Sequence, residues 1–145
     1  MTVQRVVAVD PGREKCGVAV VDRQQGALWR QVVESATLPK IVADLLERFG
    51  CRIVVLGDQT ASGTVRQLLQ PLQDQLLTNE IILIDEHGST EEARSRYWQA
   101  IPPTGWRRFL PRGLLSPPCA VDDFAAIILG ERYFKKNINS CKKNI

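Results

Sequence analysis

The chain has 145 residues, enough for one domain with a hydrophobic core and too few for two domains of ordinary size. Its composition, 44% hydrophobic and 24% charged, is that of a globular protein and excludes a disordered or fibrous chain. No apolar run approaches the roughly 20 residues that span a bilayer, and Asp10 interrupts the N-terminus before a signal-peptide core could form. We therefore expect a cytoplasmic protein without a membrane partner.

The net charge of +3 is unevenly distributed along the chain. Four of the 19 basic residues follow Phe134, so residues 1–134 carry 15 basic and 16 acidic groups. The four cysteines form no CxxC pair and His87 is the single histidine, so a zinc site has almost no ligands. The sequence thus predicts one nearly neutral domain over residues 1–134 and a basic tail over residues 135–145.

The N-terminal third of the chain favours antiparallel strands. Short β-branched runs at residues 5–10 and 16–22 are separated by the sequence PGREK, which predicts a hairpin with a tight turn. Residues 27–35 can supply a third strand. Together these segments predict a three-stranded meander.

Helices and strands alternate in the middle of the chain. Pro39 opens an amphipathic helix that Gly50 ends, and residues 52–58 are apolar on both faces, as an interior parallel strand requires. A second amphipathic segment at residues 64–77 leads to a strand at residues 80–86. The β-α-β-α-β order predicts parallel strands added to the meander.

The last third of the chain is predicted to hold two helices joined by a long loop. Residues 89–100 begin with a capping box of Ser89 and Glu92. Residues 101–118 contain five prolines and form neither helix nor strand. Residues 120–136 have helical apolar spacing, and we expect the tail after them to fray. The whole pattern predicts an α/β fold, with a central mixed five-stranded sheet and helices on both faces.

Acidic residues stand where the first, fourth and fifth predicted strands end and where the last helix begins. They are Asp10, Asp58, Asp85, Glu86, Asp122 and Asp123. Because the carboxyl ends of parallel strands form the ligand-binding crevice of open α/β sheets, the strand-end acids are expected to meet at one edge. Clustered carboxylates repel one another, by about 4 kcal/mol per pair at 4 Å, unless a cation compensates. For any single acid, a helix cap or a turn is the alternative.

Such a cluster of carboxylates favours Mg²⁺ or Mn²⁺, which prefer oxygen ligands. Two such ions about 4 Å apart can activate a water and stabilise the leaving oxygen in phosphodiester cleavage. The sequence therefore points to metal-dependent chemistry on phosphate esters.

The segment between Ala93 and Val121 combines arginines with aromatic residues and has no acid. Arginines neutralise phosphates, and aromatic side chains stack on unpaired bases, a mixture suited to single-stranded or junction substrates. We expect nucleic-acid contacts from Arg94, Trp98, Trp106, Arg107, Arg108 and Arg112. The alternative is that Trp98 and Phe109 pack onto the core while the arginines face water.

Three blocks, VVAVDPGREKCGVAV, IDEHGSTEEARSRYW and VDDFAAIILGERYF, occur in an order and spacing that resemble the YqgF (RuvX) group of RuvC-like nucleases. The likeness reaches Phe134, and the loop GWRRFLPRGLLSPP is similar to the cyanobacterial branch of that group. It implies an RNase H-like fold. It also implies catalytic metal ligands at Asp10, Glu86 and Asp122, with Asp85 a close rival of Glu86.

Three positions depart from the pattern of that family. The usual Asp-Glu-Arg reads Asp85-Glu86-His87, which replaces a permanent cation by a mostly neutral imidazole. The fourth strand ends in Leu-Gly-Asp instead of Gly-Leu-Pro and adds Asp58 as a possible metal ligand. The hairpin lysine is displaced to Lys15, our candidate for the phosphate contact that the resemblance implies.

The resemblance implies a divalent-metal-dependent endonuclease that acts first of all in maturation of the 5′ end of 16S ribosomal RNA. Two alternatives stay open: a Holliday-junction resolvase acting on four-way DNA, and a non-catalytic RNA-binding domain with the same fold. A resolvase needs two sites related by symmetry, so both a monomer and a homodimer remain possible.

Overall fold

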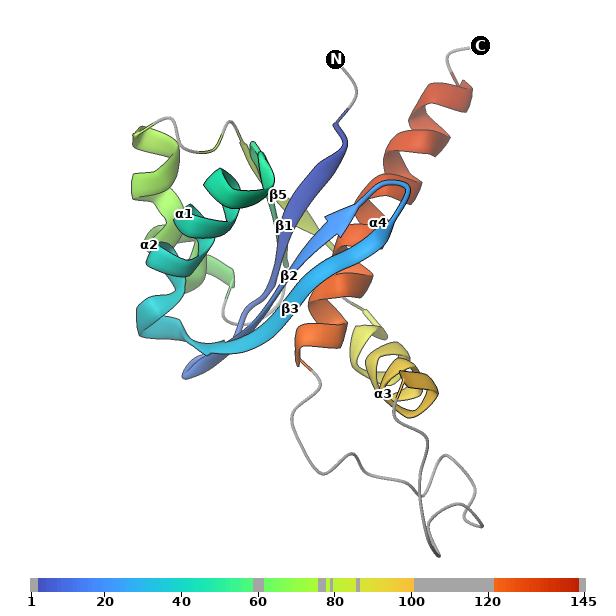
Figure 1. Cartoon of the computed structure of the whole chain (residues 1–145), viewed down its shortest axis with the longest axis horizontal. Coiled ribbons are helices and arrows are strands. Elements are labelled where there is room, and N and C mark those ends of the chain that lie inside the picture. The colour runs from blue at the N-terminus through green and yellow to red at the C-terminus, as the bar shows by residue number, and fades with distance from the viewer. Residues whose placement is uncertain are drawn as a thin grey trace, which may run out of the picture.

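The computed structural model of the chain describes residues 3–58, 62–75, 78, 80–85, 87–100 and 122–143. Within these ranges the chain forms a mixed five-stranded sheet with helices on both faces (Figure 1). This arrangement confirms the predicted α/β fold. No helix in the described ranges is long and apolar enough to cross a membrane.

Three antiparallel strands begin the fold. Strand β1 (Arg5–Asp10) pairs with β2 (Lys15–Asp22), and β2 pairs with β3 (Gly26–Glu34). The β-branched side chains of β1 and β2 suit a pleated, buried surface, and seven of the eight residues of β2 are buried. The register aligns Asp10 with Gly17, so Asp10 is still a paired residue of its strand.

Two parallel strands extend the sheet on the other side of β1. Strand β4 (Ile53–Gly57) pairs with β1, and β5 (Glu80–Ile84) pairs with β4, which gives the order β3-β2-β1-β4-β5. A 3₁₀ turn (Ser35–Thr37) and helix α1 (Leu38–Phe49) lead from β3 to β4, and α2 (Ser62–Asp74) leads to β5. Parallel strands require such crossovers. In this strand order, β1 lies in the middle of the sheet.

The last two helices lie on the opposite face of the sheet from α1 and α2 (Figure 1). They are α3 (Ser89–Ala100) and α4 (Asp122–Lys143), which pack against each other. A Cβ atom on Gly130 of α4 would lie only 2.6 Å from Cγ2 of Val21 in β2. Glycine thus allows α4 to approach the sheet more closely than any other residue would.

The final helix continues further into the basic tail than the sequence predicts. A frayed tail is expected after Lys136, but α4 continues to Lys143. No glycine or proline follows Gly130, so nothing in the sequence forces the helix to end earlier. The predicted boundary between residues 134 and 135 falls inside α4. The predicted loop over residues 101–118 lies outside the described residues.

Two hydrophobic clusters cover the two faces of the sheet. Along β1, Val6 and Ala8 belong to the cluster with α3 and α4, whereas Val7 and Val9 belong to the cluster with α1 and α2. Side chains of a strand alternate between the faces, so Asp10 follows Ala8 onto the α4 face. The central strand thereby directs a carboxylate toward the side of the sheet on which α4 packs.

Candidate functional site at the carboxyl ends of the parallel strands

Three acidic residues lie at the carboxyl ends of neighbouring parallel strands. The register places Asp10 level with Gly57, the last residue of β4, and Asp58 follows one residue later. The N–H of Asp58 donates a hydrogen bond of 3.1 Å to the carbonyl oxygen of Ile84, and Asp85 follows Ile84 directly. The structure therefore brings Asp10, Asp58 and Asp85 to one edge of the sheet, which we call the acidic edge.

The side chains of the acidic edge differ in exposure. Asp10 is partly buried, whereas Asp58 and Asp85 are exposed. Carboxylate oxygens are the ligands that Mg²⁺ and Mn²⁺ prefer, so these donors fit such an ion chemically. In the part of the chain that the structure describes, no three acidic, histidine or cysteine side chains are close enough to hold a metal. The predicted ligands Glu86 and the Asp122 side chain lie outside that part.

Ser35, the residue that follows β3, holds the turn after Asp10 in place. The hydroxyl of Ser35 donates a hydrogen bond of 3.0 Å to the carbonyl oxygen of Gly12, and its N–H donates one of 2.8 Å to Glu14. A Cβ atom on Gly12 would lie 2.0 Å from the carbonyl oxygen of Lys15, so this turn requires glycine. No local pattern predicts this role of Ser35, because its contact with Gly12 spans 23 residues.

Cys16, the second residue of β2, completes this contact. Its Sγ lies 3.3 Å from Oγ of Ser35 and 3.7 Å from the carbonyl oxygen of Gly12. Cys16 is buried and free, as expected of a structural thiol. Lys15, the predicted phosphate contact, is exposed beside it at the start of β2. Its role remains a prediction.

The start of α4 is tied to the sheet through Asp123. Its Oδ2 accepts a hydrogen bond of 2.8 Å from Nη1 of Arg30 on β3, and its Oδ1 accepts one of 2.9 Å from the N–H of Phe124. The Arg30 guanidinium also lies 4.3 Å from the centroid of the Phe124 ring. Asp123 is buried and used for structure, whereas the role of the preceding residue, Asp122, as the helix acid stays a prediction.

Trp98 is a core residue, so its predicted contact with nucleic acid is wrong. Its exposed fraction is 4%, and its ring meets that of Tyr97 edge to face, with 5.1 Å between the centroids. The cause is the packing of α3 against α4, which turns Trp98 toward the interior. Arg96 is likewise used for structure, because it forms a bidentate ion pair with Glu131 of α4.

Of the other predicted nucleic-acid contacts, Arg94 on α3 is exposed and remains a prediction. The rest lie outside the described ranges: Trp106, Arg107, Arg108 and Arg112.

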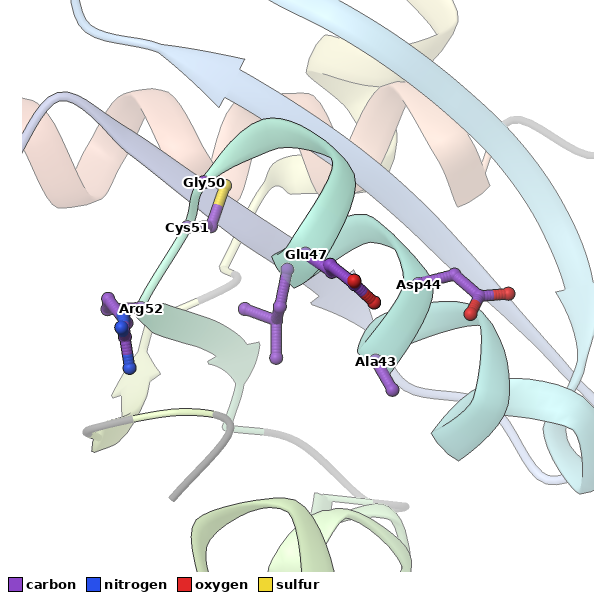
Figure 2. A pocket seen from close by; sticks show the side chains of 7 residues that line it. Ala43, Asp44, Glu47, Gly50, Cys51 and Arg52 are labelled. Atoms are coloured by element: carbon purple, nitrogen blue, oxygen red, sulfur yellow. The ribbon is translucent and has the colours of Figure 1, made fainter. Parts of the chain in front are cut away.

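A cavity of about 380 Å³ lies at the other end of the sheet, away from the acidic edge. It is formed by the last turns of α1 and the segment that leads into β4 (Figure 2). Burial raises the pKa of the Cys51 thiol in its wall to about 11; the Arg5 charge opposes this shift and the Asp22 charge adds to it. A protonated thiol is a poor nucleophile at neutral pH, so Cys51 is no candidate for nucleophilic catalysis.

Comparison with known proteins supports the fold. No family model and no curated protein matches the chain, so the resemblance to the YqgF group stays a prediction. Thermus thermophilus RuvC superposes with a TM-score of 0.64 at 14% identity, covering 93% of this chain and 96% of that one. The same enzyme "in complex with Holliday junction substrate" gives 0.63 at 15% identity, with the same coverage.

A viral protein shows the same likeness. The fowlpox virus Holliday junction resolvase gives a TM-score of 0.59 at 14% identity, over 92% of this chain and 99% of that one. The part of the chain that the structure describes therefore has a RuvC-like RNase H fold.

Proposed function

We propose that the chain is a divalent-metal-dependent endonuclease that hydrolyses phosphodiester bonds at the acidic edge. The observation that carries the proposal is the position of Asp10. It ends the central strand of a RuvC-like fold, next to the ends of β4 and β5, which Asp58 and Asp85 follow. Ligands of open α/β sheets bind at this edge, and acidic side chains there suit a cation that carries phosphate chemistry.

In this proposal Asp10, Glu86 and Asp122 hold Mg²⁺ or Mn²⁺, and Asp58 or Asp85 assists. When bound, such an ion supplies a nucleophilic water and stabilises charge on the phosphate. The chain contributes a fixed geometry: pairing with Gly17 of β2 holds the backbone of Asp10, pairing with β4 holds the residues just before it, and Ser35 holds the turn behind it.

Two substrates are supported by different observations. The resemblance of the three sequence blocks favours precursor 16S ribosomal RNA, cut near its 5′ end, as the first candidate. The fold comparison favours a second candidate, four-way DNA, because RuvC and the fowlpox resolvase are junction proteins by name. Either substrate would place the protein in the cytoplasm. The proposed contacts are Lys15, Arg94, Trp106, Arg107, Arg108 and Arg112.

A cleavage assay on matched substrates tests the proposal. Purified protein is mixed with labelled precursor RNA, a four-way DNA junction, or a linear duplex of one junction arm, with Mg²⁺, Mn²⁺ or EDTA. We expect cleavage of the RNA or the junction only with metal, and none of the duplex. If the protein binds nucleic acid but cleaves none of the substrates in any of these conditions, the third candidate, an RNA-binding domain without turnover, would replace the proposal.

The oligomeric state helps to separate the two substrates. A junction resolvase acts as a dimer because two symmetric cuts require two sites, whereas processing of one RNA end requires a single site. Light scattering at micromolar concentration, with and without junction DNA, measures this directly. A monomer in both conditions supports the RNA role, and a dimer supports the junction role.

A further inference from the structure

A second cavity lies where the end of β5 meets the middle of α4. Its volume is about 310 Å³, at the lower end of the range that small ligands occupy, and it is lined by Ile84, Asp85, His87, Arg132 and Lys136. Because β5 is the last strand on this side of the sheet, the cavity lies at the margin of the acidic edge. Asp85 belongs to both features.

Arg132 is held in place by two contacts. Its Nη1 donates a hydrogen bond of 2.8 Å to the carbonyl oxygen of Asp85, and its Nη2 lies 3.1 Å from Oε1 of Glu92 on α3. These contacts use two of the five N–H groups of a guanidinium. A planar, fixed guanidinium loses little entropy on binding a phosphate, whose oxygens match its geometry.

Lys136 lies one helical turn after Arg132, so both cations lie on the same side of α4 and line the same cavity. The third charged residue of the lining is Asp85. One of its carboxylate oxygens accepts a hydrogen bond of 2.9 Å from the N–H of His87, which forms a turn after β5. The lining therefore holds two cationic groups and one carboxylate, and the Glu92 carboxylate pairs with Arg132 beside it.

We propose that this cavity binds one phosphate of the nucleic-acid backbone, through Arg132 and Lys136. The inference rests on the proposed nuclease function, and it adds a site that would hold the substrate strand in place. A phosphate held beside Asp85 would belong to a nucleotide next to the one that lies on the acidic edge. The cavity would thereby set the register of the substrate without touching the bond that is cut.

Binding in EDTA tests the cavity separately from catalysis. Fluorescence anisotropy measures the affinity of a labelled single-stranded RNA and of a four-way junction between 50 and 200 mM salt. The test variant is Lys136→Gln. The matched control is Lys135→Gln, which removes the same charge from the neighbouring exposed residue, outside the cavity lining.

We expect Lys136→Gln to weaken binding about tenfold at 50 mM salt, as loss of a hydrogen bond to a charged group does. It should also reduce the slope of log affinity against log salt by about 0.7 to 0.9, the value for one phosphate contact. Lys135→Gln should change the affinity by less than about twofold. Arg132→Lys, which keeps the charge but loses the planar fork, should also weaken binding.

Equal effects of Lys135→Gln and Lys136→Gln, or no effect of either, would overturn the phosphate cavity while leaving cleavage by the wild type untouched. If Lys136→Gln alone weakens binding but the wild type cleaves nothing with metal, the cavity stands and the nuclease proposal fails. A wild type that binds no nucleic acid overturns both.

Discussion

Aspartates end both strands of the first hairpin, at opposite ends of the sheet, and their surroundings differ. Asp22, at the end of β2, has an exposed fraction of 2% and accepts hydrogen bonds from Arg5, Gln4 and the turn that follows it. Asp10, at the end of β1, is partly buried at the edge where Asp58 and Asp85 are exposed. The Asp22 carboxylate holds neighbouring parts of the fold together, whereas the Asp10 carboxylate lies where a ligand can reach it.

Hydrogen bonds determine the ionisation of Asp22. Burial alone would raise its pKa, but hydrogen bonds from the N–H of Gln25, from Arg5, from the N–H of Gln24 and from Gln4 together lower the pKa to about 2. Arg5 also donates a 3.4 Å hydrogen bond to the carbonyl oxygen at the end of α1. This end of the sheet therefore joins β1, β2 and α1 through one ionised carboxylate.

The comparison shows what the sequence can and cannot distinguish. The strands RVVAVD and KCGVAVVD both end in Val-Asp after a buried run. Within the strands themselves, nothing separates the structural aspartate from the catalytic candidate. The difference lies in the donors that the fold brings to each carboxylate.

The largest expected effect is on catalysis, from Asp10→Asn. The substitution keeps the shape of the side chain and removes a proposed metal ligand, so cleavage should fall by at least about 100-fold, the upper value for loss of an outer-shell partner of a metal site. Thermal unfolding should be nearly unchanged. The measurement is cleavage per folded molecule, with Asp44→Asn, an exposed acid on α1, as the control. If cleavage survives Asp10→Asn, the acidic edge takes no part in the mechanism.

Asp22→Ala should have the opposite profile. It leaves the N–H groups of Gln24 and Gln25 without their acceptor, which should lower the free energy of unfolding by about 1–3 kcal/mol. Cleavage per folded molecule should stay within about twofold of the wild type. Urea unfolding, together with the cleavage assay, measures both. A fully stable variant with reduced cleavage would reverse the roles that we assign to the two ends.

The pH dependence of stability should reveal the Asp22 contribution. Its pKa is about 2 in the folded chain and 3.8 when unperturbed, so the carboxylate stabilises the fold fully above pH 3.8. That stabilisation is lost as the pH falls through 2. Urea unfolding at pH 5, 4, 3 and 2 should show a steeper loss for the wild type than for Asp22→Asn. Parallel curves for the two proteins would argue against this assignment.

The smallest expected effect comes from Ser35→Ala, which removes the hydrogen bond to Gly12 behind Asp10. It should lower the free energy of unfolding by about 1 kcal/mol. It should also weaken activation by Mn²⁺, because the turn that positions Asp10 is loosened. The matched control is Thr37→Ala, which removes a hydrogen bond of 2.8 Å from its hydroxyl to the carbonyl oxygen of Glu34 and leaves the contact with Gly12 intact. An equal loss of Mn²⁺ activation in both variants would show that Ser35 has no positioning role.

Much of the fold could be predicted because it depends on local patterns. The period-two runs of β1 and β2, the helix that Gly50 ends and the apolar strand β4 lie within a few residues of their predicted places. The prediction of a frayed tail was wrong because a polar sequence without glycine or proline can continue a helix that already packs on the sheet.

The site could be predicted only in part. The strand-end acids follow from chain order, but the contact of Arg30 with Asp123 spans 93 residues and has no local signal. Trp98 misled the prediction because an aromatic residue next to arginines is equally typical of a binding surface and of a helix packed on a core.

The central claim is that Asp10 holds a divalent ion at the acidic edge. Calorimetric titration of Mn²⁺ into the wild type and Asp10→Asn, with no nucleic acid present, tests it most directly. We predict saturable binding by the wild type and at least tenfold weaker binding by Asp10→Asn. Equal affinities of the two proteins for Mn²⁺ would contradict the claim.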